Sequence, residues 1–185
     1  KVHLERLAQR TGEAVHLVTA GAATTALYYV TLKMARGQEG QLIPAFFHSF
    51  KQNLKQATAL WVGYLAVGIL LVLDLVICLQ TSSVFAGAMF FTSVVLLACW
   101  ALFITMLFPL VARCDNTIGA LFKMGIAMAL RNVMPVLAAL MVTVAFFAVG
   151  VFVFWPVLLV APGLASYCNA FLFNRIFDKY GMTLE

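Results

Sequence analysis

The stretch "ATALWVGYLAVGILLVLDLVICL", residues 57–79, carries a single charged side chain, Asp74, along its whole length. A helix needs about 20 consecutive apolar residues to cross the hydrocarbon core of a bilayer. The stretch therefore predicts a membrane-spanning helix over about residues 56–79. Three further apolar runs of similar length follow it, and they predict spans over about residues 84–111, 133–155 and 157–174.

The composition agrees with a membrane protein. The chain of 185 residues is 64% hydrophobic and only 10% charged, and its mean hydropathy is +1.00. Soluble domains contain roughly 45–50% apolar and about 25% charged residues. A soluble fold of this size could not hide so much apolar surface from water. We therefore expect an all-α, polytopic bundle with four spans and the lipid bilayer as its solvent.

The formal net charge of +5 does not indicate nucleic-acid binding, because the basic residues lie in the connections between apolar runs. Positive residues mark the cytoplasmic side of membrane proteins. The loops at 36–55 and 112–132 and the C-terminal tail are therefore expected to be cytoplasmic, with "QTSS" (80–83) and the Trp155–Pro156 turn outside. The basic residues on the expected inner side are Arg36, Lys51, Lys55, Arg113, Lys123, Arg131, Arg175 and Lys179.

The segment "FKQNLKQATALW" (50–61) predicts an amphipathic helix that starts at Pro44 and continues into the first span. Helical spacing places Phe47, Phe50, Leu54, Ala57 and Trp61 on one stripe, with His48, Lys51, Gln52 and Lys55 opposite. A second basic helix is expected over 116–131, capped by Asp115 or Asn116. Two roles stay open for these helices, namely anchoring to lipid headgroups and docking of a protein partner. The basic contact residues would be Lys51, Lys55, Lys123 and Arg131.

We interpret residues 1–185 as a single membrane domain. It comprises a polar segment (1–13), a partial or full span or a packed helix (14–35), and two comparable units (44–111 and 116–180). Each unit contains an amphipathic helix followed by a hairpin. This weak repeat predicts two hairpins related by an axis along the membrane normal.

Candidate polar sites within the spans are few. Asp74 could form a partner or solute site with Thr24 and Thr25, or lie at the lipid interface, because intramembrane charges are costly. Three asparagines near span ends are expected to make interhelical hydrogen bonds: Asn132, Asn169 and Asn174. Six glycines are interpreted as close-packing positions: Gly63, Gly68, Gly87, Gly125, Gly150 and Gly163.

We expect no enzymatic activity, cofactor or metal. The sequence contains no nucleophile elbow and no phosphate-binding glycine loop. The four cysteines and three histidines show no metal-ligand spacing. Cys78, Cys99, Cys114 and Cys168 are interpreted as small apolar packing residues.

Three ordered motifs resemble the YesL-like family of small, mainly Gram-positive bacterial membrane proteins, a domain of unknown function. They are "TAGAATTALYYVTLKMARGQEG" (19–40), "FFHSFKQNLKQATALW" (46–61) leading to "LVLDL" (71–75), and "APGLASYCNAFLFNRIFDKYG" (161–181). Members of the family open with a further apolar helix. "KVHLERLAQRTGEAVHL" is too polar to be that helix, so we expect the natural first helix to be missing or altered here.

The resemblance implies a role in carbohydrate import, because genes of this family commonly lie beside those for oligosaccharide ABC importers. The first hypothesis is an accessory subunit that binds an ABC permease in the bacterial cell membrane. The alternative is an independent small-solute transporter or channel that acts as a homo-oligomer. A scaffold or signalling component is a third option.

The charge pattern predicts an inward C-terminus. Green fluorescent protein fused after Glu185 should fluoresce, and alkaline phosphatase inserted after Gln80 should be active, because the first folds only inside the cell and the second only outside. The reverse pair of results would contradict this topology.

Overall fold

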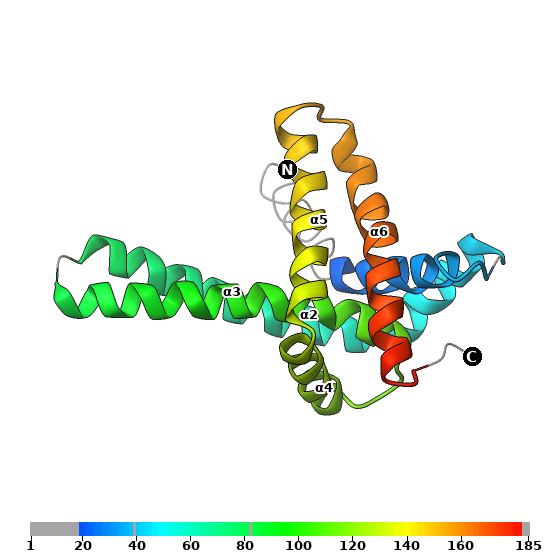
Figure 1. Ribbon diagram of the computed structural model, residues 1–185, viewed down its shortest axis with the longest axis horizontal. Helices are drawn as coiled ribbons and strands as arrows, with labels where there is room; N and C mark the ends of the chain where they lie inside the picture. The colour runs from blue at the N-terminus through cyan, green and yellow to red at the C-terminus, as the bar shows by residue number, and fades with distance from the viewer. Residues whose placement is uncertain (1–18, 39, 82, 183–185) are drawn as a thin grey trace, which may run out of the picture.

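The computed structural model describes residues 19–38, 40–81 and 83–182. These residues form helices and short connections, with no strand among them. A helix over residues 19–34 precedes α2 (Leu42–Gln80), α3 (Val84–Arg113), α4 (Ile118–Arg131), α5 (Val133–Phe152) and α6 (Val157–Lys179) (Figure 1). Among the described helices, α2, α3, α5 and α6 are long and apolar enough to cross a membrane. The predicted all-α membrane fold is confirmed, while residues 1–18 lie outside the described part.

The four apolar helices form two hairpins, α2–α3 and α5–α6. The chain leaves α2 at Gln80, and Ser83 starts α3 by accepting a hydrogen bond from the Ala86 backbone N–H at 3.1 Å. Such a cap satisfies one of the N–H groups that a helix leaves unpaired at its start. The second hairpin turns through residues 153–156. The C-terminal ends of the four predicted spans lie within five residues of the ends of α2, α3, α5 and α6.

The amphipathic stretch before the first span is the first part of α2, which starts at Leu42 and does not break. Of the predicted stripe, Ala57 is buried and Phe50, Leu54 and Trp61 pack against the core. The buried positions also include Ser49, Asn53 and Leu60, which were not part of that stripe. Phe47 is 55% exposed. Small side chains let α2 approach its neighbours closely, and the Asn53 amide is satisfied by the Ser49 carbonyl at 3.1 Å. The stripe prediction was therefore only partly right.

The helix α4 connects the two hairpins. Its N-cap is Thr117, whose hydroxyl accepts from the Ala120 N–H at 3.4 Å, so the prediction of Asp115 or Asn116 as the cap was wrong. Asn132 ends α4 with non-helical dihedral angles (φ −127°, ψ 44°) and α5 starts directly after it. This break lets the chain change direction between α4 and α5.

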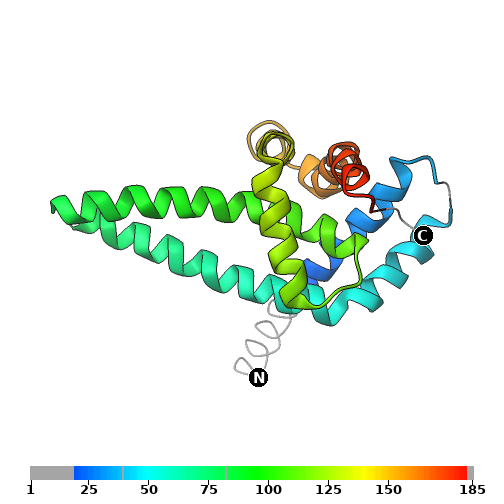
Figure 2. The same ribbon diagram turned by 60° about the horizontal axis from the view of Figure 1, so that its bottom comes forward.

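The two hairpins point in different directions. In Figure 1 the α2–α3 hairpin extends to the left and the α5–α6 hairpin extends upwards, and Figure 2 shows the second hairpin almost end-on. A rotation about the membrane normal would leave both hairpins pointing the same way. The predicted symmetry axis along the normal is therefore not observed. The cause is the change of direction at Asn132, after which α5 packs across α3.

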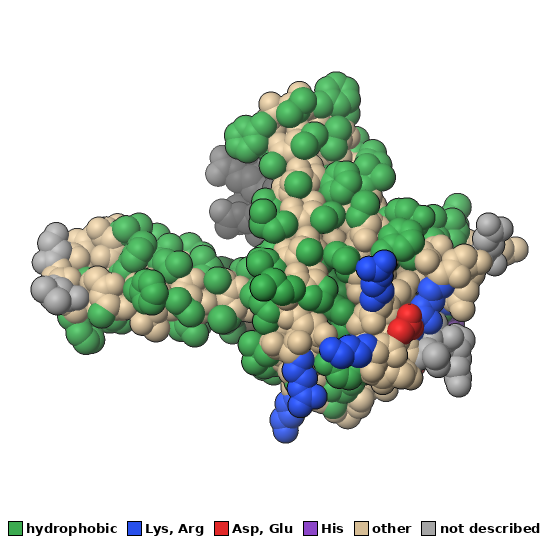
Figure 3. Space-filling model, in the orientation of Figure 1, with side chains coloured by type: hydrophobic (Ala, Val, Ile, Leu, Met, Phe, Trp, Pro, Cys, Tyr) green, Lys and Arg blue, Asp and Glu red, His purple; other side chains and the backbone are tan. Residues whose placement is uncertain are grey.

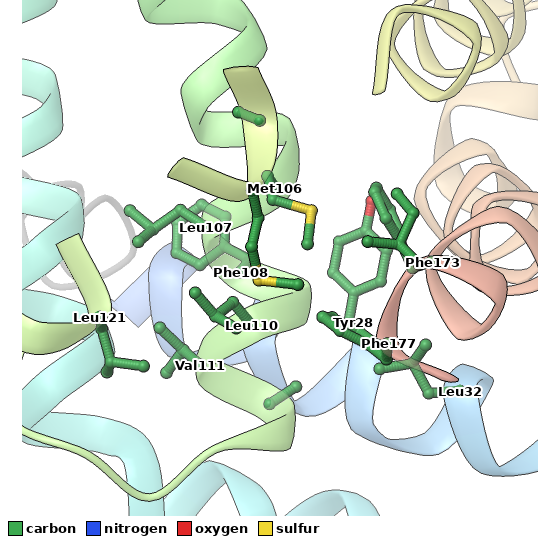
Figure 4. Close-up of a cluster of buried hydrophobic side chains, with 14 of the residues drawn as sticks. Tyr28, Leu32, Met106, Leu107, Phe108, Leu110, Val111, Leu121, Phe173 and Phe177 are labelled. Atoms are coloured by element: carbon green, nitrogen blue, oxygen red, sulfur yellow. The ribbon is translucent and has the colours of Figure 1, made fainter. Parts of the chain in front are cut away.

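The main core lies where the hairpins meet, at the end of each hairpin opposite its turn. Figure 4 shows Met106, Leu107, Leu110 and Val111 of α3 at its centre. Neighbouring elements surround them with Tyr28, Leu32, Leu121, Phe173 and Phe177. The helix over 19–34 supplies the first two of these side chains, so it packs against the others, and whether it also crosses the membrane stays a prediction. We call this region the base.

The outer part of each hairpin is apolar and exposed. Leu70, Ile77, Phe85 and Phe91 on the first hairpin are each more than half exposed, and Figure 3 shows hydrophobic side chains along both hairpins. Exposed apolar patches larger than a few hundred Å² are rare on soluble monomers. These surfaces fit contact with lipid or with another membrane protein.

The glycines separate into two groups. A Cβ added at Gly68, Gly125 or Gly150 would press on a neighbouring side chain, so the close-packing interpretation is confirmed there. A Cβ at Gly63, Gly87 or Gly163 would meet nothing within 4 Å, so these three are not close-packing positions within the chain. Sequence spacing alone does not distinguish the two groups.

Gly68→Ala should lower the thermal stability of the protein in detergent. The new methyl group would overlap the Trp100 indole, which stacks on Tyr64 with ring centroids 3.9 Å apart and donates from Nε1 to the Tyr64 carbonyl at 3.2 Å. Overpacking of this kind costs about 1–3 kcal/mol. Gly63→Ala, in the same helix but facing open space, is the matched control. Equal melting temperatures for the two variants would contradict the packing described here.

Candidate functional site

A cluster of polar side chains joins three elements at the base. Arg36 follows the helix over 19–34, Arg113 ends α3, and Asn174 and Asp178 lie one turn apart on α6. The Asn174 Oδ1 accepts from Arg36 Nε at 3.0 Å and from Arg113 Nη1 at 3.2 Å. Its Nδ2 donates to the Leu32 carbonyl at 3.0 Å. We call these four residues the polar cluster.

The polar cluster places two guanidinium groups around one carboxylate. Arg36 Nη2 forms an ion pair with Asp178 Oδ1, and Arg113 Nη2 lies 4.0 Å from the same oxygen. The side chain of Arg113 is fully buried, whereas that of Asp178 is 59% exposed. Because water screens the exposed carboxylate, much of the compensation for the buried charge must come from hydrogen bonds.

Arg113 obtains part of that compensation from the end of the described chain. It donates to the Met182 carbonyl, and its guanidinium carbon lies 5.1 Å from the centre of the Phe177 ring. Its Nε has no hydrogen-bond partner among the described residues. The Arg113 guanidinium therefore uses some but not all of its hydrogen-bond donors. Its contacts hold the end of α3 against the end of α6.

The three asparagines make the predicted interhelical hydrogen bonds. Asn132 donates to the Tyr180 hydroxyl at 3.1 Å, Asn169 donates to the Thr143 hydroxyl at 2.9 Å, and Asn174 acts within the polar cluster. Each bond joins segments distant in the sequence. Buried amides of this kind fix how apolar helices are positioned relative to one another.

Asp74 has a partner inside its own hairpin. Its carboxylate contacts the hydroxyl of Ser93, a buried residue of α3. That hydroxyl also lies 2.9 Å from the Met89 carbonyl, and its single proton can serve only one of the two acceptors at a time. Asp74 therefore joins α2 to α3 near the outer turn.

Thr24 and Thr25 do not join Asp74 in one site. Their hydroxyls donate to the carbonyls of Ala20 and Gly21 in their own helix, at 2.9 and 3.0 Å. This helix meets α2 near Trp61, where Gly21 makes a close approach. Asp74 lies 13 residues further along α2, roughly 20 Å at 1.5 Å per residue. The predicted polar site is therefore not assembled.

The four predicted basic contacts, Lys51, Lys55, Lys123 and Arg131, are all exposed. They lie on α2 and α4 towards the base, and Figure 3 shows that basic side chains gather at this end of the visible face. Whether they contact lipid headgroups or a protein partner stays a prediction.

Sequence reasoning missed the polar cluster as a unit. In the sequence, Arg36 and Arg113 mark only the membrane orientation, and nothing distinguishes Asp178 from the other charged residues. The interacting residues are separated by 61 to 142 positions, so no local spacing reveals them. A weak signal was present, because charged residues lie just beyond the ends of several apolar runs.

An apolar groove opens between the first hairpin and α4. Two adjoining cavities of about 330 and 530 Å³ form it, and Val67, Trp100, Phe103 and Phe122 line both. The rings of Phe103 and Phe122 are 4.8 Å apart between centroids. We call this feature the α4 groove.

No group of three or more His, Cys, Asp or Glu side chains suited to a metal ion occurs within the described residues. The cysteines in this part of the chain are free thiols. Burial raises the pKa of the Cys114 thiol, and the nearby Arg113 charge offsets only part of this increase. Cys114 is therefore protonated and a poor nucleophile near neutral pH.

Arg113→Lys should destabilise the base. A lysine cannot reach Asn174, Asp178 and the Met182 carbonyl with one planar group, and the loss of charged hydrogen bonds costs about 1.5–3 kcal/mol. The matched control is Arg175→Lys, an exposed arginine on α6. Thermal unfolding in detergent should show a clear loss for the first variant alone. Similar curves for both variants would show that the polar cluster contributes nothing to stability.

The family described as "Protein of unknown function, DUF624" matches residues 14–75. YesL-like proteins belong to this family, so the resemblance is confirmed over residues 14–75, which contain the first two of the three motifs. The matched region includes the helix over 19–34 and most of α2. No curated protein and no solved structure matches the chain.

Proposed function

We propose that this membrane protein is an accessory subunit that binds the permease of an oligosaccharide ABC importer. The observation that carries the proposal is the contrast between its surfaces and its interior. The hairpins expose broad apolar faces, whereas the polar side chains predicted for a transport path lie apart. Such a chain is suited to contacts within the membrane.

The apolar faces offer the area that a membrane partner needs. Association within lipid depends on packing and interhelical hydrogen bonds, because lipid tails are as apolar as the side chains. The second hairpin carries glycine at position 163, where α6 leaves open space beside its backbone. An incoming helix could approach closely there.

The alternative, an independent transporter or channel, has less support. It required Asp74 and the small polar residues around Thr24 to line one path. Asp74 instead contacts Ser93, and Thr24 bonds to its own helix. A homo-oligomer could still build a path between copies, so the experiment below includes that outcome.

The carbohydrate part of the proposal rests on the family resemblance and not on the fold, since a fold does not specify a substrate. The bacterial cell membrane and an inward C-terminus belong to the same proposal. We also propose that the chain catalyses no reaction, because its sequence carries no recognisable catalytic motif.

The test is gentle solubilisation of the tagged protein from its native host, followed by quantitative mass spectrometry of the proteins that co-purify. Permease and solute-binding components should be recovered in near-stoichiometric amounts. The double variant Lys51→Gln/Lys55→Gln should reduce that recovery severalfold, because it removes exposed charge from the start of α2.

Arg175→Gln/Lys179→Gln, which removes the same charge from exposed positions of α6, is the matched control and should leave recovery unchanged. Recovery of the protein alone or as a self-oligomer would favour the transporter. A deletion strain with unchanged oligosaccharide uptake and permease abundance would refute the accessory role.

A further inference from the structure

We propose that the α4 groove is a binding site for one anionic phospholipid, with an acyl chain in the groove and the headgroup phosphate at Lys123 and Arg131. This inference is independent of the proposed function, because lipid retention requires no permease.

The lining of the α4 groove is the first argument. Its larger cavity, about 530 Å³, is bounded by Leu71 of α2, Trp100 of α3 and Ile126 of α4, all of them apolar. A ligand without polar groups would lose no hydrogen bonds with water by entering this cavity, whereas a polar solute would lose its hydration. The occupant is therefore apolar along this part of its length.

The two cavities of the α4 groove form one continuous apolar path. A narrow, flexible acyl chain can pass from one cavity to the other along the residues that the two share, including Val67 and Phe103.

The position of the basic residues indicates the charge of the headgroup. Phe122, Ile126 and Leu130 line the larger cavity at a spacing of four residues. Lys123 and Arg131 each follow one member of this stripe, so they lie about 100° further around α4, and both are exposed. They lie on the side of α4 away from the core, beyond the edge of the groove that this stripe lines.

The charge beside the groove is positive on balance. The helix α4 contains no acidic residue, and the nearby Asp115 in the preceding loop accepts hydrogen bonds from Gln52 at 3.3–3.4 Å. Basic residues near a membrane surface attract anionic lipid. Figure 2 shows α4 lying across the first hairpin, which places these residues near the headgroups when that hairpin crosses the bilayer.

Gly63 makes the proposal testable without disturbing the core. It lines the smaller cavity, and an added Cβ there would meet nothing within 4 Å. Gly63→Leu should therefore fill the groove and leave the helices in place. Gly87→Leu is the matched control, because Gly87 of α3 also has open space but lies near the outer turn, away from the groove.

The experiment is native mass spectrometry of the full chain in detergent micelles that contain equal amounts of phosphatidylglycerol and phosphatidylcholine. The unaltered protein should retain one phosphatidylglycerol preferentially. Gly63→Leu should lower this adduct at least fivefold, whereas Gly87→Leu should not. Lys123→Gln/Arg131→Gln should remove the preference for phosphatidylglycerol, and Arg175→Gln/Lys179→Gln should keep it.

Equal phosphatidylglycerol adducts in Gly63→Leu and Gly87→Leu would overturn the groove as the lipid site. Equal retention of the two lipids by the unaltered protein would overturn the anionic specificity. If Gly63→Leu abolished co-purification of a membrane partner but left the lipid adduct intact, the groove would hold a segment of that partner and the lipid proposal would be wrong.

Discussion

The side-chain amide of Asn174 forms hydrogen bonds with three groups at the base. Its oxygen receives hydrogen bonds from Arg36 and Arg113, and its nitrogen donates to the Leu32 carbonyl. The helix over 19–34, α3 and α6 all end around this one residue. Because Arg113 is buried, its charge must be compensated by fixed partners, and these partners determine how the three helix ends are arranged.

The two hairpins extend from this polar base and differ from it in composition. The hairpins that extend from it contain few polar side chains, and several of those bond within the hairpin or to their own helix. Asp74 contacts Ser93, and Asn169 bonds to Thr143. An apolar solvent favours this arrangement, because a buried polar group without a partner is costly. The interior is thus used for structure, and the surfaces remain available for binding.

Two of these surfaces have different chemistry. The α4 groove is apolar, and exposed basic residues lie on the adjacent side of α4, which suits an anionic lipid. The outer faces of the hairpins are broad and apolar, which suits another membrane protein. A lipid in the groove would also fill the space between α4 and the first hairpin, so the two proposed ligands would be compatible and need not compete.

The sequence by itself determined the fold class and the approximate limits of the apolar helices, because hydrophobicity and helix length are local properties that the bilayer thickness constrains directly. It also indicated that asparagines near the helix ends would form interhelical bonds. Only the tertiary structure decided that Arg36, Arg113, Asn174 and Asp178 form one cluster, that Thr24 and Asp74 do not meet, and that the hairpins diverge at Asn132. These features depend on contacts between residues far apart in the chain, and periodicity within a helix carries no information about which distant helix covers each face.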